Sequence, residues 1–203
     1  MAYVLTALGA YLLGCSNLAY YICKIKKVDI RTGGSGNLGA SNTTTLLGWY
    51  AGIAVAIHDA GKALLAVMLA NLFFPETAHI GAVAGVASVL GHIFPFYLKF
   101  RGGKGFASYF GMTFALNWKL ALVILGLVIL VTVITDYIVV GTTLTILTVP
   151  VYQGMAEGSL ILALILCVAT VVIIYKHRMN YVRIYNGTEI GLRSAARGEH
   201  RIK

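Results

Sequence analysis

Long runs of apolar residues constrain the fold of this chain more than any other feature. The runs cover roughly residues 2 to 23, 51 to 74, 78 to 98, 119 to 152 and 158 to 176. A helix needs about 20 apolar residues to cross the core of a bilayer, so each run is long enough to form a span. Hydrophobic residues make up 59% of the 203, and charged residues only 11%, far from the balance of soluble domains. The sequence therefore predicts an integral membrane protein.

Two shorter apolar pieces, roughly residues 38 to 48 and 105 to 117, follow glycine-rich loops. Both are too short to cross and predict half-membrane helices, because irregular backbone is tolerated at membrane depth only where it is buried or lines a cavity. The predicted fold class is all-α: a polytopic helical bundle of five full spans plus two short half-membrane helices, seven helices in total. Asp136 interrupts the run from 119 to 152, which forms either one long helix or two.

The distribution of Lys and Arg predicts the orientation. Basic residues cluster at Lys24 to Arg31, at Lys99 to Lys104 and from Lys176 onward, whereas Glu76 and Glu157 mark the opposite ends of the spans. The positive-inside rule then places the N-terminus outside and the C-terminus and the basic, glycine-rich loops in the cytoplasm.

We expect two regions: a single transmembrane catalytic domain over 1–190 and a basic cytoplasmic tail over 191–203. The net charge of +9 favours contact with anionic lipid headgroups, not with nucleic acid, because no soluble domain presents the charge to a groove. The three cysteines show no paired spacing, so the sequence predicts neither a disulfide framework nor a metal site.

The loop Arg101 to Gly105 is the first candidate site. Gly102, Gly103 and Gly105 leave backbone amides bare, and Lys104 adds a positive charge before a predicted helix N-terminus, which also favours anions. These features favour a phosphate site. The alternative is a basic turn that anchors a helix to the cytoplasmic leaflet.

A second polar stretch, Gly33 to Gly48, leads into the other short helix. Its small and polar residues are costly at membrane depth unless they face a cavity or a ligand. Close packing between helices is the alternative, but it does not require a hydroxyl and two carboxamides. The candidate residues are Gly34, Ser35, Gly36, Asn37, Ser41 and Asn42.

Asp59 and Lys62 lie three residues apart in an apolar run and therefore on one helix face. At 1.5 Å per residue they lie about 12 Å from the start of the span. Ionisable groups inside the membrane are by default candidates for function. Two roles stay open: the pair touches substrate, or it positions the loops.

A third polar cluster closes the last apolar run. If the helix continues past Lys176, His177 and Asn180 share a face and Arg183 lies one turn further on. A basic helix end would explain Lys176, Arg178 and Arg183, but it explains His177 and Asn180 less well.

Together these stretches match a family. GSGNLGASN at 34–42, GHIFPFYLKFRGGKGFA at 91–107 and HRMNYVRIYNGTE at 177–189 closely resemble the three signature motifs of the bacterial acyl-phosphate:glycerol-3-phosphate acyltransferases, the PlsY family. The resemblance implies an enzyme of phospholipid biosynthesis in the bacterial cytoplasmic (inner) membrane. It would move a fatty acyl group from acyl phosphate to the sn-1 hydroxyl of glycerol 3-phosphate, giving lysophosphatidic acid, with no metal, cofactor or obligate protein partner.

The resemblance also implies roles for single residues. A catalytic set would surround the substrate phosphate: Ser35, Lys104, His177 and Asn180. A substrate-binding set would let it approach and shape the pocket: Gly34, Gly36, Asn37, Ser41, Asn42, Gly102, Gly103, Gly105 and Arg183. Apart from the resemblance, our own candidates for a supporting set behind these residues are Asp59, Lys62, His92, Thr142 and Glu189.

The acyl phosphate donor is already activated, so positioning and charge stabilisation suffice for the chemistry. The donor's own phosphate is our hypothesis for the group that helps deprotonate the acceptor hydroxyl. His177 is the alternative base, because an unperturbed imidazole titrates near neutrality.

The chain departs from the family pattern at Thr45, where members usually have arginine, and in the region around Thr142, where they usually have a basic residue and paired serines. A threonine hydroxyl cannot replace a bidentate guanidinium. Two alternatives therefore stay open: a paralogue that acylates another phosphorylated polyol, and a non-enzymatic lipid or phosphate carrier. The carrier is less favoured because the polar clusters share one side of the membrane and no internal repeat is visible.

Overall fold

The computed structural model describes residues 1–200, which form helices, short 3₁₀ turns and loops, with no strand in that range. The α-helices, in order, are α1 (Ala2–Cys15), α2 (Leu18–Lys26), α3 (Ala40–Leu47), α4 (Trp49–Phe73), α5 (Ile80–Ile93), α6 (Phe106–Leu116), α7 (Trp118–Thr135), α8 (Ile138–Ala156), α9 (Leu160–Tyr185) and α10 (Leu192–Arg197). Two 3₁₀ turns, η1 (Ile30–Thr32) and η2 (Phe96–Leu98), lie in the loops before α3 and α6.

Within residues 1–200, six helical stretches are long and apolar enough to cross a membrane. The predicted all-α membrane bundle is confirmed, but the count of five full spans differs, because the run from 119 to 152 forms two antiparallel helices. Asp136 ends α7 in a left-handed conformation with φ of 68°, and extended Tyr137 begins the return into α8. The two helices contain 18 and 19 residues, so each is about as long as a bilayer core is thick.

The first span is broken. Helix α1 ends at Cys15, and the side chain of Asn17 accepts a hydrogen bond from the Tyr20 amide at 2.9 Å, which caps the start of α2. The two short helices α3 and α6 correspond to the predicted half-membrane helices over 38–48 and 105–117.

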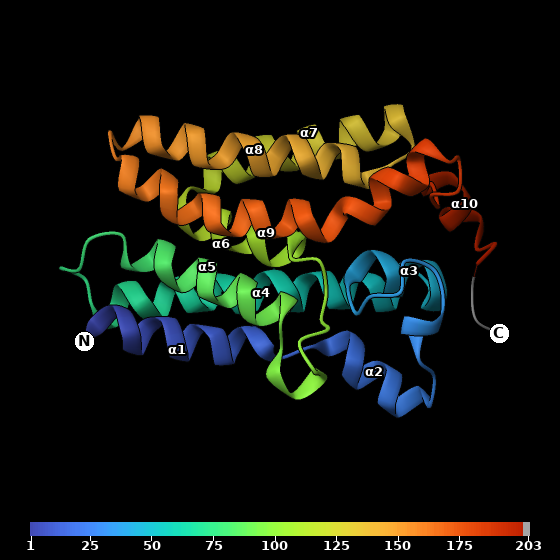
Figure 1. Cartoon of the computed structure of the whole chain (residues 1–203), viewed down its shortest axis with the longest axis horizontal. Helices are drawn as coiled ribbons and strands as arrows, with labels where there is room; N and C mark the ends of the chain where they lie inside the picture. Colours follow the sequence, from blue (N-terminus) through green and yellow to red (C-terminus); the bar gives the residue numbers. More distant parts are fainter. Residues whose placement is uncertain (201–203) are drawn as a thin grey trace.

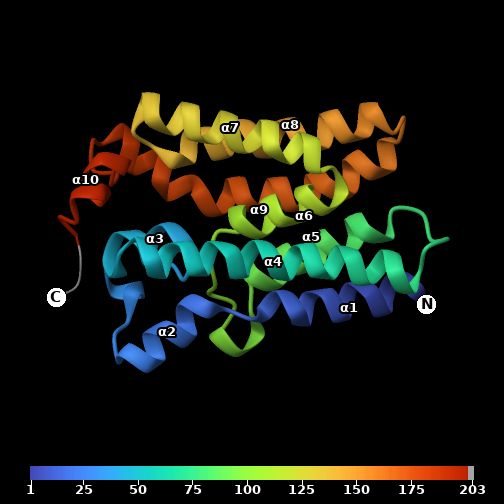
Figure 2. The ribbon, with the colours of Figure 1, turned by 180° about the vertical axis from the view of Figure 1, so that it is seen from behind.

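The helices form two layers with α6 between them. Figures 1 and 2 show α1, α4 and α5 on one side and α7, α8 and α9 on the other, and α6 contacts α4, α5, α7 and α8. The N-terminus lies at one end of the bundle, and α10, the last helix, lies at the other end, close to α3 (Figure 1).

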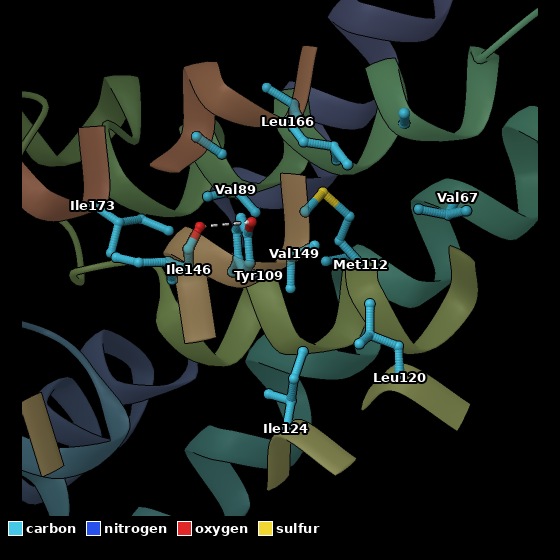
Figure 3. Close-up of a cluster of buried hydrophobic side chains, with 14 of the residues drawn as sticks. Val67, Val89, Tyr109, Met112, Leu120, Ile124, Ile146, Val149, Leu166 and Ile173 are labelled. Atoms are coloured by element: carbon cyan, nitrogen blue, oxygen red, sulfur yellow. Dashed lines mark hydrogen bonds between the residues drawn. The ribbon is translucent and has the colours of Figure 1, made fainter. Parts of the chain in front are cut away.

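The core is built around α6. Tyr109 and Met112 are fully buried and pack against apolar side chains from α5, α7, α8 and α9 (Figure 3). The Tyr109 hydroxyl lies 3.3 Å from Thr170 Oγ1, so its polar end is satisfied in the core. Gly111 lies so close to the Ala60 backbone that a Cβ atom would overlap it, which brings α6 against α4. This packing fixes α6, and therefore fixes the glycine-rich loop that precedes it.

Candidate active site

The three sequence motifs meet in a small polar pocket of about 80 Å³. Its walls come from the loop and helix around α3, from the loop before α6, and from α9 with the turn that follows it. The lining residues are Gly34, Ser35, Ser41, Asn42, Thr45, Lys104, Asn180, Arg183, Thr188, Glu189 and Ile190.

A chain of hydrogen bonds crosses this pocket. The Lys104 ammonium donates to Asn180 Oδ1 at 2.6 Å, and Asn180 Nδ2 donates to Glu189 Oε1 at 2.5 Å. Arg183 Nε donates to the other oxygen of Glu189 at 2.6 Å. An ammonium has three hydrogens to donate, so Lys104 has two without a protein acceptor in the described part of the chain. Two cations therefore face a single carboxylate, which suits the pocket to a further anion.

Lys104 lies outside the membrane-spanning stretches, and its surroundings adjust its charge. Burial lowers the pKa of Lys104 to about 8, whereas the negative charge of Glu189 acts in the opposite direction. Lys104 is therefore still mostly protonated at neutral pH.

Asn42 organises the other wall of the pocket. Its Oδ1 accepts from the Ser35 amide at 2.8 Å, and its Nδ2 donates to the carbonyls of Ile30 at 2.8 Å and Asn37 at 3.0 Å. The Ser35 hydroxyl donates to Asn37 Oδ1. Gly34, with φ of 56°, lies so close to Asn42 that a Cβ atom would overlap its Oδ1. With its amide group fully used, Asn42 shapes the loop and has no donor left for a ligand.

The amides of the second glycine loop are less free than the sequence suggested. Gly102 donates its amide to the Ile93 carbonyl at 3.1 Å, and Gly103 to the His92 carbonyl at 3.2 Å. A Cβ atom on Gly103 would overlap the His92 imidazole. These two glycines therefore allow the loop to lie directly on the end of α5, and neither lines the pocket.

A second, mostly apolar cavity of about 390 Å³ adjoins the polar pocket, and the two share Ser41, Lys104 and Asn180 in their walls. It extends between α4, α6, α7 and α8, and its apolar walls include Ala56, Ile57, Ala60, Phe106, Phe110, Leu125, Ile138 and Val139. Asn37, Asp59, His92, Gly105, Thr142 and His177 also line it.

His177 and Asn180 are both buried on one face of α9, as their spacing predicted. Nδ1 of His177 lies 2.9 Å from the Ile173 carbonyl one turn earlier. Since a carbonyl only accepts, Nδ1 carries the proton and Nε2 is left with a lone pair. His177 thus supplies a hydrogen-bond acceptor to the wall of the apolar cavity.

Thr45 lies buried in the wall of the polar pocket, but its hydroxyl is already used. It donates to the Ser41 carbonyl at 3.1 Å, and Thr43 and Thr44 make the equivalent bond one turn back. Thr45 therefore contributes a methyl group and an already bonded hydroxyl to the polar pocket, at the position where family members usually have an arginine.

The turn after α9 forms one wall of the polar pocket, and the helix that follows it, α10, is hydrogen-bonded to Asp136. Asp136 Oδ1 accepts from the Arg193 amide at 2.9 Å, and the Asp136 carbonyl accepts from Leu192 at 2.8 Å. These bonds join α10 to the turn between α7 and α8. Residues 201–203 of the predicted tail lie outside the described residues.

Most predicted site residues line one of the two spaces, but Gly36, Gly102, Gly103 and Lys62 line neither. Sequence reasoning missed Thr188, which lies in the third motif, and Ile190, which directly follows it. It also did not single out Thr143, whose hydroxyl lies 2.6 Å from the Tyr181 hydroxyl. It also missed the apolar lining residues, because nothing distinguishes them from other residues of an apolar run.

Comparison with protein families matches residues 4–187 to the glycerol-3-phosphate acyltransferases. The chain belongs to the glycerol-3-phosphate acyltransferase family. It is 37% identical over 205 residues to glycerol-3-phosphate acyltransferase 1 of Oceanobacillus iheyensis, covering 96% of this chain and 97% of that protein. It is 40% identical over 195 residues to glycerol-3-phosphate acyltransferase of Clostridioides difficile, covering 93% and 94%.

Among solved structures, this glycerol-3-phosphate acyltransferase family member is similar to PlsY (YgiH), an integral membrane glycerol 3-phosphate acyltransferase. The glycerol 3-phosphate form of that protein superposes with a TM-score of 0.89 at 30% identity, over 96% of this chain and 97% of the other. The lysophosphatidic acid form gives a TM-score of 0.84 at 30% identity, over 94% and 95%.

Proposed function

We propose that this protein transfers a fatty acyl group from acyl phosphate to the sn-1 hydroxyl of glycerol 3-phosphate, giving lysophosphatidic acid and phosphate. The observation that carries the proposal is the junction of the two spaces: a cationic polar pocket and an apolar cavity that share Ser41, Lys104 and Asn180. Such a pair of spaces suits reactants that combine a phosphate with a long hydrocarbon chain. The names of the relatives support the same activity.

The geometry supports the following catalytic roles. Lys104 and Arg183 bind phosphate in the polar pocket, and the acyl chain lies between α4, α6, α7 and α8. The reacting carbonyl then lies at the junction, next to the unused ammonium hydrogens of Lys104. Fixed charge at that point stabilises the oxyanion that develops as the hydroxyl attacks.

The reaction needs no covalent acyl-enzyme. The acceptor oxygen bonds to the acyl carbon, the bond from that carbon to the phosphate oxygen breaks, and the proton ends on the released phosphate. His177 Nε2, which has a free lone pair in the cavity wall, orients the acceptor hydroxyl and serves as the alternative base. Ser35, Asn37 and Asn42 hold the first loop in the shape that receives the phosphate.

We place the protein in the bacterial cytoplasmic membrane with its N-terminus outside and with the active-site loops and C-terminus in the cytoplasm. The basic clusters support this orientation, and the N-terminus and α10 lie at opposite ends of the bundle (Figure 1). The polar pocket then opens where water-soluble glycerol 3-phosphate is available.

The deciding experiment supplies purified protein in detergent with radiolabelled glycerol 3-phosphate and either palmitoyl phosphate or palmitoyl-CoA. We expect labelled lysophosphatidic acid from palmitoyl phosphate alone, abolished by Lys104→Ala. Lys99→Asn is the matched control, because Lys99 is an exposed basic residue of the same loop with φ of 53°, which asparagine tolerates, and it lines neither space. No product from folded protein would refute the proposal.

A related phosphorylated polyol is the second candidate acceptor, and Thr45 is the observation that favours it. Position 45 offers no cation to the polar pocket, so recognition of the acceptor rests on Lys104 and Arg183. Substituting other labelled polyol phosphates in the same assay separates the two: a kcat/KM higher than that for glycerol 3-phosphate would identify the paralogue.

A further inference from the structure

A second cluster of buried charge lies beneath the glycine-rich loop. Asp59 and Lys62 of α4 and His92 of α5 are 1%, 5% and 2% exposed. Charged groups in the interior of a membrane-spanning bundle are costly unless they are closely paired. The proposed reaction gives this cluster no direct role.

All three hydrogen-bond donors of the Lys62 ammonium have partners inside the protein. Its ammonium lies 2.6 Å from the Ser16 carbonyl, 3.0 Å from Asp59 Oδ1 and 3.0 Å from His92 Nδ1. An ammonium has three hydrogens, so none is left for a phosphate. Of the two roles left open by the sequence, direct contact with substrate is thereby excluded for Lys62.

His92 links the charged cluster to the glycine-rich loop before α6. Its Nδ1 lies 3.0 Å from the Lys62 ammonium and 3.3 Å from Asp59 Oδ1, so both members of the ion pair contact this side of the ring. Gly103 rests against the opposite, Nε2 side of the ring, where a Cβ atom would overlap Nε2, and its amide donates to the His92 carbonyl at 3.2 Å. Lys104 is the next residue.

Asp59 is the charge that holds the cluster together. Its Oδ1 lies 3.0 Å from Lys62 and 3.3 Å from His58 Nδ1, and His58 Nε2 lies 3.0 Å from the Ser16 hydroxyl. The cluster therefore joins the break between α1 and α2 to α4, to the end of α5 and to the loop.

We propose that Asp59, Lys62 and His92 are positioning residues for Lys104. The ion pair fixes the His92 imidazole, the imidazole supports Gly103, and Gly103 sets where the Lys104 ammonium enters the polar pocket. The kinetic part of this inference rests on the proposed function, whereas the phosphate-binding part does not.

The test is a mutant cycle on the full chain in lipid nanodiscs, with inorganic phosphate as the probe and calorimetry as the readout. Asp59→Asn with Lys62→Met removes both charges together, which avoids leaving one of them buried and unpaired. We expect this double change to weaken phosphate binding about tenfold, because a displaced Lys104 loses its geometry. In a Lys104→Met background the same double change has less than about a twofold effect, because the residue it acts through is absent.

Equal losses in both backgrounds, or no loss with Lys104 present, would overturn the proposal. His79→Gln is the matched control, because it changes a partly buried contact with Ser159 at 3.0 Å in the opposite end of the bundle, and we expect unchanged phosphate affinity. If the double variant does not fold, Lys62→Arg takes its place, since a guanidinium cannot reproduce the three contacts of the ammonium.

Kinetics then separate positioning from stability. A positioning role raises the KM for glycerol 3-phosphate and lowers kcat per folded molecule, whereas a merely structural role lowers only the folded fraction and leaves both constants of the folded molecules unchanged. If even the unchanged protein transfers no acyl group, the proposed function fails while the phosphate cycle still decides the positioning role.

Discussion

Lys62 is buried and Lys104 is partly buried, and the two lysines differ in how many of their ammonium hydrogens have a protein acceptor. Lys62 donates to Ser16, Asp59 and His92, so its three hydrogens are used. Among residues 1–200, Lys104 donates only to Asn180, and it faces a pocket with two hydrogens unused. Both sites place a cation near a carboxylate, so charge does not distinguish them. The count of unused donors does, and it separates a structural lysine from a ligand-binding one.

The largest expected effect is on folding, from Lys62→Met. The change leaves the Asp59 carboxylate buried without its main cation, which costs about 3–5 kcal/mol. Thermal unfolding in detergent, followed by intrinsic fluorescence, measures the loss. Lys104→Met should leave the unfolding temperature nearly unchanged, and equal destabilisation by both variants would contradict the comparison.

For activity, the larger effect comes from replacing Lys104, not Lys62. Lys104→Met removes the donor nearest the developing oxyanion, which lowers kcat by about 10²–10³-fold. The measurement is the initial rate of lysophosphatidic acid formation by protein that still unfolds cooperatively. A kcat within a few-fold of the unchanged protein would show that the unused donors of Lys104 do not serve the reaction.

The pH dependence sharpens the contrast, because Lys104 titrates near pH 8. Below that pH the ammonium is charged; above it the charge is lost, so the KM for glycerol 3-phosphate should rise about tenfold per pH unit. The stability of the substrate-free fold changes in the opposite direction and rises with pH. The unfolded chain binds this proton up to about pH 10.4, so the substrate-free fold gains stability between about pH 8 and pH 10.

Lys104→Arg is the control for the pH profile, because a guanidinium keeps its charge over this range. Its KM, whatever its absolute value, should stay flat from pH 7 to 9. The same rise in both proteins would assign the titration to another group.

The smallest expected effect concerns Thr45, whose hydroxyl is used within α3. Thr45→Val keeps the shape and removes that hydroxyl, so the KM for glycerol 3-phosphate should change by less than about twofold, since the lost bond is a local one. Steady-state kinetics of the two proteins measure this KM. A much larger rise in KM would show that the Thr45 oxygen contacts the acceptor despite its bond to Ser41.

Local pattern was enough to predict the membrane bundle, the short helices and the shared face of His177 and Asn180, because apolar length and helical spacing determine them directly. The division of the run from 119 to 152 was left open, since Asp136 is also compatible with a single polar residue in a long helix, and only the positive φ at that residue shows the turn. The amides of Gly102 and Gly103 were expected to be free, but their acceptors are the carbonyls of His92 and Ile93, which belong to another element. Which donors are used is a property of tertiary contacts, and a single sequence does not reveal it.

The wall that Thr188, Glu189 and Ile190 contribute to the polar pocket has a consequence for synthesis. All six candidate spans precede these residues, so a growing chain that has completed α9 has its bundle but lacks one side of the binding site. The tether from Asp136 to α10 also waits for the final residues. The ribosome therefore completes the six spans before it completes the binding site, and a chain still being translated is a membrane protein before it is an enzyme.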